Sequence, residues 1–154
     1  MKGNAKLLKA LNELLADELT AINQYMVHAE MCSSWGYSKL HDNIQARAIT
    51  EMKHAEHLIE RILFLEGTPI VSSLNDIHIA DEVPKMMTND LAAEMRAVKS
   101  YNEAIQLASE VGDNATGEIL KGILRDEDAH VDDIEEQKDQ IGQMGLGIYL
   151  STKK

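Results

Sequence analysis

The sequence predicts an all-α protein: a four-helix bundle with a long crossover between the second and third helices and a short C-terminal fifth helix. First, the 154 residues include 4% aromatic residues and two prolines and are rich in Ala, Leu, Glu, Ile, Lys and Met, which favours helix over sheet. Second, apolar residues recur at helical spacing in four long stretches. Third, glycine-containing breaks divide these stretches into two pairs. At this length we expect a single domain over 1–154.

The first pair of helices is expected over about 5–34 and about 38–66. Asn4 is a plausible N-cap for the first helix, because its side-chain oxygen can accept hydrogen bonds from the free backbone N–H groups of the first turn. The break over 33–36 separates the two helices, and Gly67 is expected to end the second. The pair therefore predicts an antiparallel hairpin.

Residues 67–82 lack helical period and are expected to form the long connection to the second pair. Pro84 is compatible with the first turn of the next helix, and Gly112 interrupts the pattern again. Gly145 precedes a short tail helix. The helices expected in this half run over about 83–111, 115–141 and 145–152.

The charge and the apolar pattern exclude several classes of partner. The net charge of −11 makes nucleic acid and anionic membranes poor partners, whereas cations are attracted. No apolar run is long enough to span a bilayer, and no early stretch reads as a signal peptide. Cys32 is the one cysteine, so neither a disulfide framework nor a Cys-x-x-Cys metal site is expected. These features indicate a cytoplasmic protein.

The most informative pattern is Glu-(32 residues)-Glu-x-x-His, which occurs twice with an offset of 76 residues. The two copies consist of Glu18, Glu51 and His54, and of Glu94, Glu127 and His130.

The turns give this spacing a structural meaning. The midpoint between the two Glu residues of the first copy falls at 34.5, inside the break over 33–36, and that of the second copy falls at 110.5, beside Gly112. Residues equidistant from the turn of an antiparallel hairpin lie at the same height, and residues i and i+3 share a helix face. The sequence therefore predicts that all six side chains meet at the middle of the bundle.

Four buried carboxylates would be prohibitively unfavourable unless cations compensated their charge. Two divalent ions would neutralise them, and oxygen-rich ligation with one imidazole for each metal suits Fe or Mn. Glu51 and Glu127 are the natural bridges, with Glu18 and Glu94 as terminal ligands. This arrangement is typical of ferritin-like di-iron or di-manganese bundles. The alternative is that these residues are solvated charges on surface helices. It does not explain why the pattern occurs twice, or why the residues of each copy lie at the same height.

Tyr25 and Tyr101 obey the same 76-residue offset, and each lies seven residues after a site Glu. That distance is two helical turns, so either hydroxyl could hydrogen-bond a site carboxylate or the ring could donate an electron. The alternative is a buried tyrosine with a satisfied hydroxyl. We favour the functional role for Tyr25 and leave both interpretations open for Tyr101.

Met52 is expected to face away from this centre, since it lies about 130° around the helix from the direction midway between Glu51 and His54. Ala48, Ile49 and nearby apolar residues share its face, which suggests a subunit interface. If that interface has two-fold symmetry, two Met52 thioethers could ligate a haem iron. A plain packing methionine is the interpretation that the residues alone favour.

Several segments resemble the bacterioferritin family. Glu51-Met52-Lys53-His54-Ala55-Glu56 and the following stretch from Ile59 to Gly67 are similar to its second helix. The resemblance also includes Asn23-Gln24-Tyr25, the stretch from Leu124 to His130 and the end from Met144 to Leu150, so it covers essentially the whole chain.

The resemblance implies a 24-subunit shell built from two-fold dimers, which stores and detoxifies iron. It implies a ferroxidase centre in each subunit that oxidises Fe(II) with O2 or H2O2, held by Glu18, Glu51, His54, Glu94, Glu127 and His130. It also implies a b-type haem shared by two subunits through Met52, and a small ferredoxin as the partner for iron release. Ala46 and Thr50 stand where some relatives carry His and Asp, so the resemblance does not extend to an accessory iron site on the inner surface.

A second hypothesis is a free-standing di-iron peroxide reductase of the erythrin type, which stores nothing. The tail after Gly145 favours the shell, because a small dimeric reductase would not need it. The other histidines receive no metal role: His28 lies four residues from Cys32, His41 and His78 lie near turns, and His57 lies one turn from His54.

Overall fold

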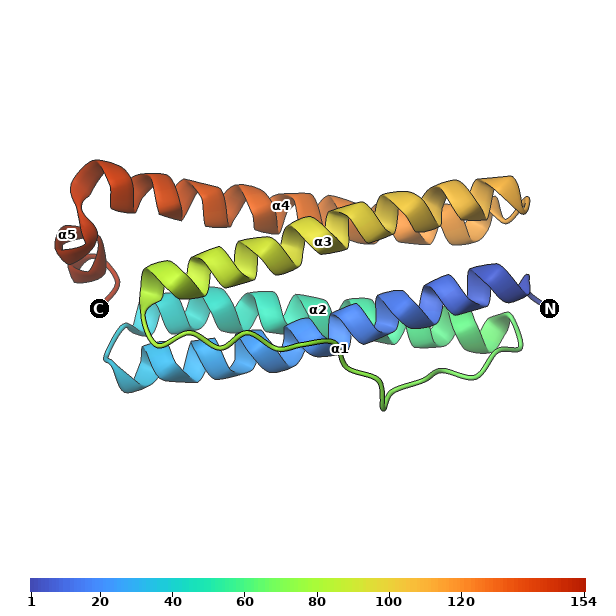
Figure 1. Cartoon of the computed structure of the whole chain (residues 1–154), viewed down its shortest axis with the longest axis horizontal. Coiled ribbons are helices and arrows are strands. Elements are labelled where there is room, and N and C mark those ends of the chain that lie inside the picture. The colour runs from blue at the N-terminus through green and yellow to red at the C-terminus, as the bar shows by residue number, and fades with distance from the viewer.

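The computed structural model describes residues 1–154 and contains five helices and no strand, which confirms the all-α prediction (Figure 1). α1 (Ala5–Ser34) and α2 (Ser38–Phe64) form one antiparallel hairpin, and α3 (Val83–Glu110) and α4 (Asn114–Met144) form the other. The crossover runs back along the bundle, so α2 and α3 point in the same direction (Figure 1). α5 (Leu146–Ser151) packs at the end of the bundle where α4 finishes. No helix is both long and apolar enough to cross a membrane.

The helix ends follow from local backbone chemistry. The Asn4 side chain accepts hydrogen bonds from the backbone N–H groups of Lys6 and Leu7, which caps α1 as expected. α2 ends at Phe64 and not at 66, because Glu66 takes a left-handed φ of 60°. α4 continues past 141 to Met144, where Gly145 supplies a φ of 85° that ends the helix.

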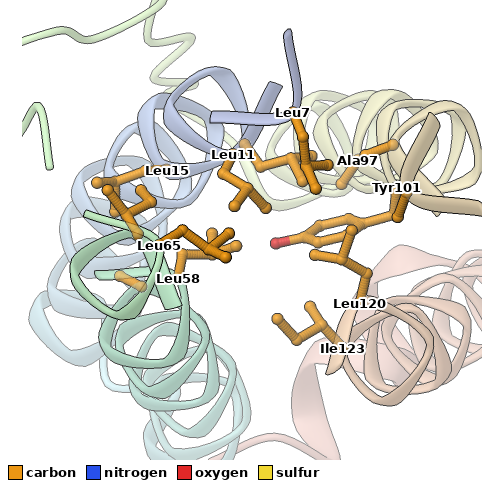
Figure 2. Close-up of a cluster of buried hydrophobic side chains, with 14 residues drawn as sticks. Leu7, Leu11, Leu15, Leu58, Leu65, Ala97, Tyr101, Leu120 and Ile123 are labelled. Atoms are coloured by element: carbon orange, nitrogen blue, oxygen red, sulfur yellow. The ribbon is translucent and has the colours of Figure 1, made fainter. Parts of the chain in front are cut away.

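Two apolar clusters fill the bundle, one on each side of its middle. The first is built from Leu7, Leu11, Leu58, Leu120 and other buried residues toward the chain's N-terminal end, and Figure 2 shows the ring of Tyr101 reaching among them. The second lies toward α5. Fully burying such a side chain contributes about 1.5–3 kcal/mol, so the two clusters hold the four helices on either side of the centre. The second cluster includes Tyr25, Leu40, Ile44, Met86, Met87, Ile134 and Tyr149.

A stripe of polar residues on α1 fixes the crossover. Asn12, Thr20, Gln24 and His28 are spaced by multiples of four residues and therefore share one helix face. Each accepts a hydrogen bond from a backbone N–H of the crossover. These N–H groups have no partner in a helix or sheet, so the side chains of α1 satisfy them. The donors are those of Ile70, Asn75, His78 and Ala80, in this order, at 2.8, 2.8, 3.0 and 3.1 Å.

Candidate metal centre

The structure brings all six predicted side chains together in the middle of the bundle. Glu18 comes from α1, Glu94 from α3, and each Glu-x-x-His pair from α2 or α4, so every helix contributes. The residues form two groups whose ligand atoms lie within 4.8 Å of one another, and each group could hold a metal ion. Glu51 and Glu127 belong to both groups, which is the bridging arrangement that the sequence predicts. The groups are Glu18, Glu51, His54 and Glu127, and Glu51, Glu94, Glu127 and His130.

Each imidazole faces the bridging carboxylate of the opposite hairpin. His54 Nδ1 lies 3.0 Å from Glu127 Oε1, and His130 Nδ1 lies 3.0 Å from Glu51 Oε1. Despite these short distances, neither nitrogen has a hydrogen-bond partner with acceptable geometry. The two nitrogens and the carboxylate oxygens thus lie close together, but the nitrogens form no hydrogen bonds with these oxygens.

The unsatisfied atoms test whether these residues fit metal ions. A buried polar atom without a partner costs about 1–3 kcal/mol, and more when it is charged, so native proteins rarely keep several together. In this chain all such side-chain atoms belong to the six ligand candidates, and a pair of divalent cations would engage them all. The atoms are Glu18 Oε2, Glu51 Oε1, His54 Nδ1, Glu94 Oε2, Glu127 Oε1 and Oε2, and His130 Nδ1.

Burial controls the protonation of the centre. Removal from water raises the pKa of Glu127 to about 12 and that of Glu18 well above its usual range. Burial alone would lower the pKa of His130, but the carboxylates of Glu51 and Glu94 outweigh it and raise the pKa to about 9. Without a cation the centre therefore holds protons near neutral pH. Metal ions must displace them, so metal affinity falls as pH falls.

Both tyrosines hydrogen-bond a terminal carboxylate, but of the opposite hairpin. Tyr25 Oη donates to Glu94 Oε1 and Tyr101 Oη donates to Glu18 Oε1, each at 2.6 Å. Burial raises the pKa of both hydroxyls well above 10, so both remain protonated donors. The geometry thus gives the two residues equivalent contacts, whereas the sequence favoured a role for Tyr25 alone.

A small cavity connects the centre to the side of the bundle that the crossover covers. Its volume is about 40 Å3, enough to hold water, and it is lined by all four site carboxylates and by Tyr25. It lies between α1 and α3, and its outer lining includes Asp17, Asn75 and Arg96. Asn75 Nδ2 donates to Asp17 Oδ1, which ties the crossover to α1 at this point. The cavity leaves the site carboxylates accessible to a small solute from this side of the bundle.

A buried polar cluster beside the centre was not found from the sequence. Asp90 Oδ1 accepts hydrogen bonds from Gln24 Nε2 at 2.8 Å and from His28 Nδ1 at 2.9 Å, and Asp90 Oδ2 accepts one from Arg47 at 3.2 Å. Because the backbone N–H of Ala80 donates to His28 Nε2, the ring proton sits on Nδ1 and the imidazole is neutral. The Arg47 guanidinium carbon also lies 4.9 Å from the centre of the Tyr25 ring. The cluster therefore links the crossover to a tyrosine of the centre.

The remaining sequence predictions concern the surface. The side of α2 that carries Met52 faces away from the centre: Met52 is 45% exposed, whereas Glu51 and His54 are buried. Ile49 and Met26 are exposed as well. His57 is exposed and belongs to neither of the two ligand groups.

Known proteins are similar in sequence to this chain over nearly its whole length. The family described as ferritin-like domain matches residues 8–144. A protein named bacterioferritin from Rhodobacter capsulatus is 40% identical over 151 residues, covering 96% of this chain and 94% of the relative. A bacterioferritin from Streptomyces coelicolor is 36% identical over 152 residues, covering 99% and 91%. One from Mycolicibacterium paratuberculosis is 36% identical over 149 residues, covering 97% and 94%. This chain therefore belongs to the bacterioferritin family of ferritin-like proteins.

Proposed function

We propose that this protein stores and detoxifies iron, and that its centre is a ferroxidase that oxidises Fe(II) to Fe(III) with O2 or H2O2. The observation that carries the proposal is the pair of buried ligand groups that share Glu51 and Glu127, since every buried side-chain atom without a hydrogen-bond partner belongs to these groups. Oxygen-rich ligation with one imidazole at each position suits iron. The bacterioferritin names of the relatives support the same activity.

The chemistry follows from the sharing of carboxylates. Two Fe(II) substrates held side by side each lose one electron, and one O2 takes up both electrons with two protons to give H2O2. Glu18 and His54 would complete one position, and Glu94 and His130 the other. The hydroxyls of Tyr25 and Tyr101 hold the terminal carboxylates in place while the charge at the centre rises.

We also propose that the ferric product is deposited as mineral inside a shell of 24 copies of this chain, assembled from two-fold dimers. The net charge of −11 would draw Fe(II) toward such a shell. Reduction of the mineral requires electrons from outside, and a small ferredoxin is the proposed donor for iron release.

Two measurements on one sample, native mass and iron retention, distinguish storage from the alternative, a dimeric di-iron peroxide reductase. Native mass should give 24 copies, and anaerobic protein loaded with excess Fe(II) and then exposed to oxygen should retain far more than two irons for each chain. Ferric absorbance should rise as oxygen is consumed. A dimer that retains at most two irons for each chain would contradict the storage proposal and support the reductase.

Met52 supports a second cofactor, a b-type haem shared by two copies of this chain. The thioether of Met52 is exposed, and Ile49, three residues before it on the same helix face, is an exposed apolar neighbour, which suits a haem edge at a two-fold interface. A haem bound there would supply a one-electron carrier between the two copies. Met52 and the same residue of a second copy would bind its iron.

Met52→Leu should abolish haem binding and leave rapid Fe(II) oxidation unchanged. Leucine keeps the apolar volume but removes the sulfur that binds iron, and the side chain points away from the centre. Haem content is measured by absorbance after reconstitution, and oxidation by ferric absorbance on the same sample. Loss of oxidation in a variant that still assembles would show that the two roles are assigned wrongly.

A further inference from the structure

The two metal positions are related by the 76-residue offset of the sequence, and most of their contacts repeat closely. The distances from His54 Nδ1 to Glu18 and Glu51 are 3.6 and 3.8 Å. The corresponding distances from His130 Nδ1 to Glu94 and Glu127 are 3.4 and 3.8 Å. The two tyrosine hydrogen bonds are equal as well, each at 2.6 Å. Around the metal-facing atoms the two halves are therefore nearly the same.

One contact of the two imidazole rings has no counterpart. His54 Nε2, on the side of the ring away from the centre, lies 2.8 Å from Asp126 Oδ2 on α4. The residue 76 positions before Asp126 is Thr50 on α2, which the offset makes the counterpart of Asp126. Its hydroxyl instead donates to the backbone carbonyl of Ala46 in its own helix, at 3.1 Å. No carboxylate therefore holds the outer nitrogen of His130.

The exposure of the two rings agrees with this difference. The side chain of His54 is 3% exposed, and that of His130 is 15% exposed. A carboxylate on the outer nitrogen of a metal-binding histidine fixes which nitrogen carries the proton, orients the ring and raises its basicity. Removal of such a partner typically lowers metal affinity about 10- to 100-fold. The two positions therefore differ in a feature that sets how strongly a metal is held.

We propose that Asp126 is a positioning residue that makes the two metal positions inequivalent. The position of Glu18 and His54 fills first and retains its metal, and the position of Glu94 and His130 fills second and loses its metal first. The inference rests on the proposed metal centre but not on its turnover. Because the ligand types and the shared carboxylates are the same on both sides, the difference between Asp126 and Thr50 is the feature that sets the order.

The chain offers a matched set of variants, because each half supplies the residue to place in the other. Asp126→Thr gives His54 the surroundings of His130, and Thr50→Asp gives His130 the surroundings of His54. The double variant exchanges them. The probe is Co2+ at one ion for each chain, and the readout is the occupancy of each position from anomalous scattering in crystals of the assembled protein.

In the parent we expect the position of Glu18 and His54 to hold about 10-fold more Co2+ than the other, or more. Each single variant should bring the occupancies close to equality, and the double variant should reverse their order. Equal occupancy in the parent, or a double variant that keeps the parent's order, would overturn the proposal.

Two further results separate this inference from the proposed function. If the parent binds no Co2+ at the centre, the metal centre itself is assigned wrongly and both proposals fail. If Co2+ fills the two positions equally while the protein still oxidises Fe(II), only the inference about Asp126 fails. Asp126 is 54% exposed on the surface of α4, so its replacement should leave the assembly intact, which native mass checks.

Discussion

Glu127→Gln should slow Fe(II) oxidation by at least about 100-fold while leaving the stability of the metal-free protein nearly unchanged. Glu127 belongs to both ligand groups, so a neutral amide in its place removes an anionic ligand from both metals at once. Loss of a partner that only orients a ligand already costs about 10- to 100-fold in affinity or activity, and loss of a shared ligand should cost more. The initial rate of ferric absorbance after oxygen is added measures the effect.

The unchanged stability follows from the protonation of the centre. Because burial raises the pKa of Glu127 to about 12, the metal-free protein already holds this side chain uncharged at neutral pH. Glutamine has the same shape and copies that uncharged state. Divalent metal in excess should stabilise the parent, by about 2.7 kcal/mol at 100 times its dissociation constant, and should stabilise the variant far less. Thermal unfolding with and without Co2+ measures both effects.

Glu135→Ala is the matched control, since Glu135 is exposed on the same helix and makes no ion pair or side-chain hydrogen bond. Like Glu127→Gln it removes one carboxyl group from α4, and it should retain both oxidation and stabilisation by metal. If Glu127→Gln oxidised Fe(II) at the parent's rate, the shared carboxylate would not be needed and the proposed centre would be wrong. If the metal-free form of Glu127→Gln unfolded at a much lower temperature than the parent, Glu127 would have a structural role that glutamine cannot replace.

The six candidate ligands could be found from the sequence because the fold repeats them. Two copies at one offset, each centred on a turn, place Glu18 and Glu51 at one height and Glu94 and Glu127 at one height without any knowledge of how the hairpins pack. The crosswise bonds of Tyr25 and Tyr101 depend on that packing. The spacing within one helix gives each tyrosine's height along its own helix but does not give its partner.

Asp126 and the cluster around Asp90 could not be found in this way, because they occur once. The offset of 76 residues relates Asp90 to Leu14 and Arg47 to Ile123, both of which lie in the apolar cluster at the other end of the bundle. A search for residue types that recur at this offset therefore does not find these residues. A search for broken repeats would have found them, since a charged residue stands in one copy where an uncharged residue stands in the other.

Asp90→Leu should destabilise the protein by about 3–5 kcal/mol, the usual cost of removing one partner of a buried ion pair. Arg47 is 6% exposed and would keep its charge without a carboxylate, and the amide of Gln24 and the ring N–H of His28 would lose their acceptor. For a chain of this length the melting temperature should fall by roughly 6–20 °C. Thermal unfolding of the metal-free protein measures the change without a contribution from bound metal.

The double variant Asp90→Leu with Arg47→Ile tests whether the unpaired charge causes the loss. It copies the apolar pair Leu14 and Ile123 from the other half of the bundle, and replacing a buried ion pair by apolar residues is often neutral or stabilising. The double variant should therefore recover most of the stability that Asp90→Leu loses. If it stays as unstable as the single variant, the bonds from Asp90 to Gln24 and His28, which secure the crossover, are what the fold depends on, and the charge of Arg47 is not.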